Sequence, residues 1–288
     1  MAKAASDLKN AKDKTQHTAR EAAGSPWMER LVRVGYVARG LVYLIPGVLA
    51  FELALGLGGA AVNPTGAIEY LGGMPFGKAL LILMVIGLLG YSLWGLVRAI
   101  YDPFRQGDDP EGLAKRFGYI VSAFGYIVIL IATIQYLQGA TVSQNNPQDW
   151  TAKLMTLSFG RALVGIVGAG WLIGGLYQAY RGFTADLAPD YNLQKMSGQE
   201  KKLAIDIGRF GLAGRGVAFA LIGVFLIQAA VFANAGRAKG LDGVLLDLSS
   251  RPYGQIILAV TALGLVAFGV FSILSARWMR IKLPGRGR

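Results

Sequence analysis

Six long apolar stretches alternate with polar segments along this chain of 288 residues. A helix rises about 1.5 Å per residue, so each stretch is long enough to cross the roughly 30 Å hydrocarbon core of a bilayer. A soluble protein would have to bury all six helices completely, so the pattern predicts membrane-spanning helices instead. The stretches cover residues 34–57, 78–101, 117–138, 160–180, 210–233 and 254–276.

The stretches come in pairs, and the three pairs resemble one another residue by residue. The first pair opens with Gly-Tyr-Val-Ala-Arg-Gly-Leu-Val-Tyr at 35–43, and the same positions recur at 118–126 and 211–219. The second helix of each pair opens with an aromatic residue and a glycine, and another glycine follows ten residues later. These glycines are Gly77, Gly160 and Gly254, and then Gly87, Gly170 and Gly264. Such self-similarity indicates a tandem array in which each unit packs against its copies.

The predicted fold is an all-α membrane protein with six transmembrane helices, arranged as three parallel two-helix repeats around a pseudo-threefold axis. Each repeat has two spans, so every copy starts from the same side of the membrane. The connections inside the repeats are each expected to carry a short interfacial helix, and 182–208 is expected to be a linker. The expected units are a polar N-terminal segment (1–30), repeats at 31–105, 113–187 and 205–280, and a basic tail (281–288).

Composition and charge support this class and orient the spans. The chain is 53% hydrophobic and only 16% charged, which is too apolar for an ordinary soluble domain. All but six of its 29 Lys and Arg fall on the termini and on the connections between repeats. The positive-inside rule therefore places both termini in the cytoplasm of a prokaryotic cell, with the spans in its plasma (inner) membrane. The expected partners are the lipid bilayer and another membrane protein, and nucleic acid is not expected because the cations are spread over linkers and tails.

The chain offers little catalytic chemistry. It has no cysteine, and its one histidine, His17, lies in the polar N-terminal segment. Thiolate metal sites, paired-histidine haem and Ser-His catalysis are therefore unsupported, and no cofactor, metal or enzymatic activity is expected. The leading hypothesis is a non-catalytic scaffold or accessory subunit. The alternative is a channel or transporter for a small cation or proton through the repeat interface.

The first group of candidate residues is an intramembrane polar layer. Glu52 lies within the first predicted span, and its repeat equivalents are Gln135 and Gln228. Polar residues inside a membrane are candidates for a site or a pathway, and we expect these three to point toward the bundle interior. The other interpretation places Glu52 close to the outer interface, where water keeps it hydrated and the glutamines bond neighbouring helices.

The second group is Arg39 and Arg215, which occupy one repeat position just inside the predicted cytoplasmic end of a span. There they either contact a lipid phosphate or another anionic ligand, or extend to the interface and set the topology. The third group consists of glycines whose spacing on a helix favours close packing against a neighbouring helix. The predicted packing glycines are Gly40, Gly47, Gly87, Gly170, Gly174, Gly216, Gly223 and Gly264.

The thrice-repeated opening Gly-Tyr-x-x-Arg-Gly-x-x-Tyr, followed by Phe-Gly or Tyr-Gly at each second helix, resembles the bacterial membrane proteins grouped as domain of unknown function 1206. The resemblance covers about 31–280. The motif is complete in repeat one, partial in repeat three and weakest in repeat two, where Ser122 replaces the arginine. The resemblance implies a six-helix prokaryotic membrane protein of tandem two-helix units, and it implies no reaction and no residue roles.

Overall fold

The computed structural model describes residues 26–102, 107, 109–140, 147–184 and 196–278, and this part of the chain is helical with no strand. Six of its helices are long and apolar enough to cross a membrane, which confirms the predicted all-α fold of six spans. They are α2 (Pro26–Ala54), α4 (Gly77–Tyr101), α5 (Pro110–Leu137), α7 (Gly160–Thr184), α8 (Gly198–Val231) and α10 (Gly254–Trp278).

Each connection inside a repeat carries one short helix, as expected. These helices are α3 (Pro64–Gly72), α6 (Pro147–Met155) and α9 (Leu241–Ser249), each of nine residues, and a 3₁₀ turn η3 (Ala235–Arg237) precedes α9. The expected linker 182–208 is helical in its last part, because α8 already begins at Gly198. Ser197 and Glu200 form a capping box that starts this helix. The tail 281–288 and most of the N-terminal segment 1–30 lie outside the described residues.

A glycine is required where each short helix meets the following long helix. At Gly77, Gly160 and Gly254, an added Cβ would lie only 2.1, 1.7 and 1.6 Å from a backbone carbonyl oxygen. The oxygen belongs in each repeat to the leucine six residues earlier: Leu71, Leu154 and Leu248. The Phe-Gly or Tyr-Gly motif of the sequence is therefore a tight corner that no larger residue can occupy.

The aromatic residues of that corner point outward in all three repeats. Phe76, Phe159 and Tyr253 are 87%, 84% and 83% exposed, at the start of α4, α7 and α10. Aromatic side chains at the ends of spans favour the interface between lipid and water. The ends of the spans that carry these three residues are here together called the corner face. The other ends of the spans, where α2, α5 and α8 begin, are together called the entry face.

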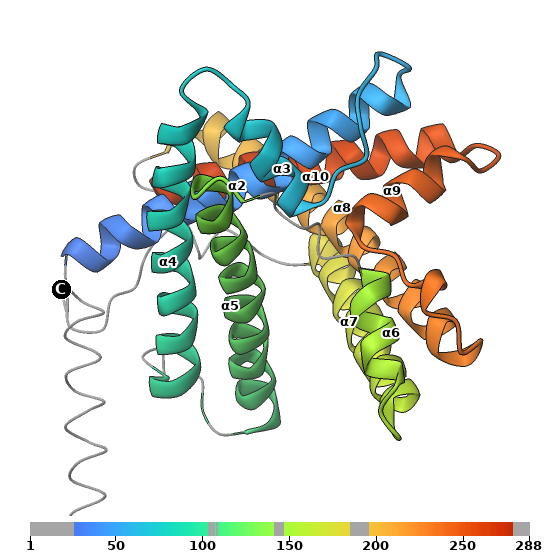
Figure 1. Ribbon diagram of the computed structural model, residues 1–288. Helices are drawn as coiled ribbons and strands as arrows, with labels where there is room; N and C mark the ends of the chain where they lie inside the picture. Colours follow the sequence, from blue (N-terminus) through green and yellow to red (C-terminus); the bar gives the residue numbers. More distant parts are fainter. Residues whose placement is uncertain (1–25, 103–106, 108, 141–146, 185–195, 279–288) are drawn as a thin grey trace, which may run out of the picture.

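The six long helices follow one another in the cyclic order α2, α4, α5, α7, α8, α10, and α10 packs back against α2. The three junctions between repeats, α4 with α5, α7 with α8, and α10 with α2, are all packed. Repeats one and three also pack their own two helices together. In repeat two, α5 and α7 form no comparable interface, and they stand apart in Figure 1. The ring of repeats is therefore open at one place, inside repeat two.

Most of the predicted packing glycines lie against a neighbouring helix. Gly40 and Gly47 approach α10, Gly216 and Gly223 approach α7, and both Gly87 and Gly264 approach the first helix of their own repeat. The prediction is wrong for Gly170 and Gly174, which have no atom of another helix within 4 Å of an added Cβ. The helix α7 packs on α8 through its other side instead, with Gly168, Gly175 and Gly182.

Arginines fasten the junctions between repeats. Arg116 of α5 donates to the carbonyl oxygens of Ala99 (2.8 Å) and Ile100 (3.3 Å) at the end of α4. Arg33 of α2 donates in the same way to Ala276 and Arg277 at the end of α10. The last carbonyl groups of a helix have no hydrogen-bond donor within the helix, and they carry partial negative charge. A guanidinium group supplies both the donor and a positive charge. Arg33 and Arg116 are repeat equivalents, and Arg209 of α8 holds the third equivalent position.

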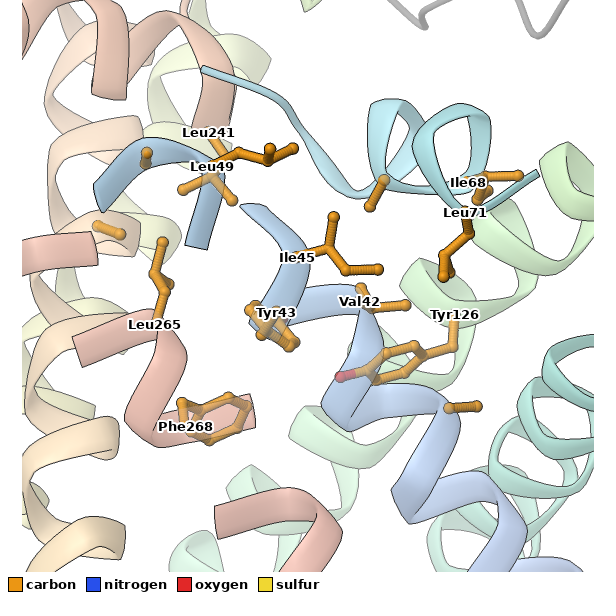
Figure 2. Packing of buried hydrophobic residues seen from close by; sticks show 14 of the residues in the cluster. Val42, Tyr43, Ile45, Leu49, Ile68, Leu71, Tyr126, Leu241, Leu265 and Phe268 are labelled. Carbon is orange, nitrogen blue, oxygen red and sulfur yellow. The ribbon is translucent and has the colours of Figure 1, made fainter. Parts of the chain in front are cut away.

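The apolar core lies where α2 meets α10 and the short helices α3 and α9. Figure 2 shows Val42, Ile45 and Leu49 following one another along α2. Leu265 and Phe268 of α10 face them from one side, and Tyr126 of α5 approaches from the other. The centre of this packing is largely aromatic, and it contains the two arginines described next.

Candidate functional site: a buried arginine and aromatic cluster

Arg39 and Arg215 lie near the middle of α2 and α8, because both helices begin well before their apolar stretches, at Pro26 and Gly198. Neither side chain extends to an interface. The guanidinium carbon of each lies 4.6 Å from the centre of the Phe268 ring of α10. One aromatic ring therefore contacts two cations that come from different repeats.

Further aromatic side chains complete this central cluster. Nη1 of Arg39 donates to the Tyr91 hydroxyl at 2.8 Å, and the Arg215 guanidinium lies 4.4 Å from the Phe219 ring and 5.0 Å from that of Tyr43. The rings also contact one another edge to face, with Tyr43 against Phe268 and Tyr91 against Tyr126, each pair 4.9 Å apart. We define the central cluster as Arg39, Tyr43, Tyr91, Tyr126, Arg215, Phe219 and Phe268.

The repeat motif explains how this cluster forms. Its arginine position supplies Arg39 and Arg215, and its last aromatic position supplies Tyr43, Tyr126 and Phe219. A spacing of four residues places the two motif positions on one face of each helix. The second helices of repeats one and three contribute Tyr91 and Phe268, which are repeat equivalents too. Sequence reasoning missed these aromatic residues as site residues, although the threefold recurrence of Tyr43, Tyr126 and Phe219 was a usable signal.

The cluster holds positive charge without an acidic counterion. Neither Arg39 nor Arg215 forms an ion pair with any residue that the structure describes. Since both lie 4.6 Å from the same ring centre, their guanidinium carbons are separated by no more than twice that distance. Two unit charges about 9 Å apart repel by about 2 kcal/mol at an effective dielectric constant of about 20. An anion bound beside both guanidinium groups would reduce this repulsion.

Several donors in the cluster also have no acceptor. The Nε atoms of Arg39 and Arg215 and the hydroxyl of Tyr126 are buried and have no hydrogen-bond partner. Tyr126 is only 4% exposed, so its hydroxyl has little access to bulk water. An arginine can only donate and a tyrosine hydroxyl can donate, so each of these atoms can bind an oxygen of an anion. Such an unpaired buried polar group costs about 1–3 kcal/mol.

The structure does not form the expected layer of Glu52, Gln135 and Gln228. All three lie in the last turn of their helices, near the corner face. Gln135 is exposed, so its expected interior placement is wrong, while Glu52 and Gln228 are half-buried. The reason is that the spans end immediately after these residues, as the alternative interpretation of the sequence had it. The candidate site is therefore the arginine pair and not the carboxylate layer.

A separate ion-pair group fastens the corner face. Asp247 of α9 accepts hydrogen bonds from Lys239 and from Nε of Arg251, the latter at 2.5 Å. Burial of the carboxyl group opposes ionisation, but these two bonds outweigh it and hold the pKa of Asp247 below its ordinary value. Lys239 also lies 4.4 Å from the Phe225 ring of α8. This group therefore ties α9 to its own repeat and gives no sign of a ligand.

The described residues contain no group of three or more His, Asp or Glu side chains that could hold a metal ion. The chemistry of the central cluster also differs from that of a metal site, because guanidinium groups and unpaired hydroxyl donors repel cations and attract anions. The arrangement can bind and orient an anionic group.

Six apolar spanning helices built as three tandem two-helix repeats define this chain as a multi-pass membrane protein. It belongs to the family described as Domain of Unknown Function (DUF1206), which matches residues 34–102, 117–185 and 210–279. The chain is also 35% identical over 249 residues to Uncharacterized protein YxxB of Bacillus subtilis (strain 168). That match covers 86% of this chain and 90% of the Bacillus protein. No solved structure matches the chain.

Proposed function

We propose that this protein is a non-catalytic membrane protein whose core binds an anionic group between Arg39 and Arg215. The observation that carries the proposal is the pair of guanidinium groups at one Phe268 ring, without an acidic partner among the described residues. The anion would also accept from the unpaired Tyr126 hydroxyl. A role as a scaffold or accessory subunit in a bacterial inner membrane remains compatible with such a site, because ligand binding can stabilise or recruit without chemistry.

The energies favour a bound anion over a purely structural role of the arginines. A cation–π contact is worth about 0.5–2 kcal/mol. Arg39 and Arg215 are half-buried, so each charge loses part of its hydration, and the mutual repulsion adds to that cost. The aromatic contacts of the two residues offset only part of it. A single anion would remove the repulsion and supply charge-assisted hydrogen bonds, which are about twice as strong as neutral ones.

The same arrangement opposes the alternative of a cation or proton pathway. A cation that crossed the ring of repeats would pass two fixed positive charges at mid-bundle, where a low dielectric strengthens the repulsion. The residues that would have lined the pathway, Glu52 and Gln228, are only half-buried at the corner face, and Gln135 is exposed. We therefore favour anion binding.

Thermal unfolding of the purified full chain in mild detergent tests this proposal, with inorganic phosphate as the probe and chloride at equal ionic strength as the reference. A ligand at 100 times its Kd stabilises the native state by about 2.7 kcal/mol. We expect phosphate to raise the unfolding temperature of the wild type by several degrees. The increase should disappear in Arg39→Gln and Arg215→Gln.

Arg237→Gln is the matched control. It removes a guanidinium that also lies over a phenylalanine ring, 4.2 Å from the centre of Phe232, but at the exposed corner face. This variant should respond to phosphate like the wild type. Equal responses to phosphate and chloride in the wild type, or a phosphate response that survives in both core variants, would refute the anion site.

A further inference from the structure

Repeat two lacks the internal packing that its two neighbours have. In repeat one, an added Cβ on Gly35 would lie 2.9 Å from atoms of Gly87 and Tyr91 in α4, and in repeat three the equivalent Gly211 would lie 2.5 Å from Phe268 in α10. The repeat-two equivalents of Gly35 and Gly87 are Gly118 and Gly170, and neither has an atom of another helix within 4 Å of an added Cβ. The same holds for Gly125 and Gly174. We call the facing sides of α5 and α7 that carry these four glycines the open seam.

Repeat two has also lost the two large side chains that fill the corresponding space in its neighbours. Repeat one has Arg39 against Tyr91, and repeat three has Arg215 against Phe268. At these two positions repeat two has Ser122 and Gly174. Because serine and glycine are much smaller than arginine and an aromatic residue, the space between α5 and α7 is not filled by side chains from these two positions. The opening therefore follows from the sequence of repeat two.

The open seam adjoins the central cluster on both sides. From α5, Tyr126 contacts Tyr91, and Tyr91 accepts the hydrogen bond from Arg39. From α7, Trp171 contacts Phe219 with ring centres 4.7 Å apart, and Arg215 lies over that same ring. Each arginine is thus separated from a seam helix by a single aromatic layer.

Two more unpaired polar atoms lie between the cluster and the entry face. They are Nε of Arg98, near the end of α4, and Oε1 of Gln178, in the second half of α7. By contrast, the flanks of α5 and α7 are apolar and exposed, for example at Phe124, Val128 and Ile166. A lipid tail suits such flanks, and a charged head group suits the polar atoms and the arginines.

We propose that the anionic ligand is a phospholipid with a net negative head group, which enters from the bilayer through the open seam. Its head group binds Arg39 and Arg215, and an acyl chain occupies the space beside Gly118, Gly170 and Gly174. This inference rests on the proposed anion site, and it adds the ligand class and the entry route. The membrane itself supplies this ligand, so the lipid reaches the site without a path from the aqueous phase.

Native mass spectrometry of the detergent-purified full chain tests the inference, with phosphatidylglycerol and phosphatidylcholine of identical acyl chains as probes. We expect phosphatidylglycerol to bind at least tenfold more tightly than phosphatidylcholine. Gly174→Phe restores the aromatic residue of the other repeats in a space that the structure leaves open, so the variant should fold. It should weaken phosphatidylglycerol binding at least tenfold, and Gly170→Phe, one turn away, should do the same.

Two controls separate this inference from the proposed function. Ile86→Phe adds bulk on an exposed side of α4 and should leave lipid binding unchanged. The inorganic phosphate response should persist in at least one of the two seam variants, because phosphate carries no acyl chain. Loss of the phosphate response in the wild type would refute the anion site itself.

Three results would overturn the lipid inference while leaving the anion site intact. The first is equal affinity for the two lipids. The second is full phosphatidylglycerol binding by both Gly170→Phe and Gly174→Phe. The third is a protein dimer that Gly174→Phe dissociates, which would assign the open seam to a second copy of the chain.

Discussion

Single residues decide whether two helices of this protein can approach, and the glycines of α7 show the contrast. Gly175 faces α8, where an added Cβ would lie 2.3 Å from the backbone nitrogen of Ala220. Gly170, on the other side of the same helix, faces open space. The two residues have the same chemistry and the same backbone, so their different surroundings alone set the effect of a methyl group.

We predict opposite effects of alanine at these two positions. Gly175→Ala should destabilise the protein by about 1–3 kcal/mol, because a backbone atom cannot move aside and the α7–α8 contact must separate. Gly170→Ala should be neutral or stabilise by up to about 1 kcal/mol, since alanine is the better helix former. Unfolding in mixed detergent micelles measures both. Equal destabilisation by the two variants would contradict the open position of Gly170.

The ion pairs of Asp247 predict a dependence on pH. The pKa of Asp247 is lowered in the folded protein, so the folded state binds its proton less readily than the unfolded state. Its stabilising contribution is complete above the ordinary aspartate pKa, and it is lost as the pH falls through the lower folded-state value. The difference in unfolding temperature between wild type and Asp247→Asn should therefore shrink on acidification below about pH 4. A difference that stays constant or grows there would contradict the ion pairs.

At the scale of elements, the sequence predicted the existence and order of the helices well, because long apolar runs have few alternatives in a membrane. It also located the three short helices between them. It did not predict where α2 and α8 begin, since both helices extend before their apolar stretches, to Pro26 and Gly198. Arg39 and Arg215 therefore lie in the middle of their helices. Hydropathy does not report helix limits of this kind.

The recurring arginine at the start of each repeat fastens one helix to the end of another, and this predicts a stability effect. Arg116→Gln leaves the carbonyls of Ala99 and Ile100 without their charged donor. We expect a loss of about 1.5–3 kcal/mol, which is typical of hydrogen bonds that involve a charged group. Thermal unfolding measures it, and Arg237→Gln serves as a surface control. A loss no greater than that of the control would show that water replaces the arginine without cost.

For the whole molecule, the repeat pattern correctly predicted three tandem two-helix units, but it did not predict the opening inside repeat two. The eight predicted packing glycines look alike in sequence, and six of them do lie against a neighbouring helix. Gly170 and Gly174 differ because the residues that would face them have changed, with Ser122 in place of an arginine. The sequence shows that repeat two has diverged from the other two repeats. That this divergence separates α5 from α7 is seen only once all three repeats are packed together in the structure.

The orientation of the molecule in the membrane is the last prediction. The entry face carries most of the Lys and Arg, and the corner face carries the exposed aromatic residues Phe76, Phe159 and Tyr253. Under the positive-inside rule the entry face is cytoplasmic. The chain has no cysteine, so single cysteines report without background. Ser158→Cys, exposed at the corner face, should react with an impermeant thiol reagent in intact cells.

Asn10→Cys, in the N-terminal segment, should react only after the cells are opened. The reverse pattern would place the corner face in the cytoplasm. The orientation also bears on the proposed ligand, because Arg98 and Gln178 lie on the entry-face side of the central cluster. If that side is cytoplasmic, the anionic lipids of the inner leaflet are the ones that reach Arg39 and Arg215 through the open seam. Reversed labelling would instead require entry from the outer leaflet.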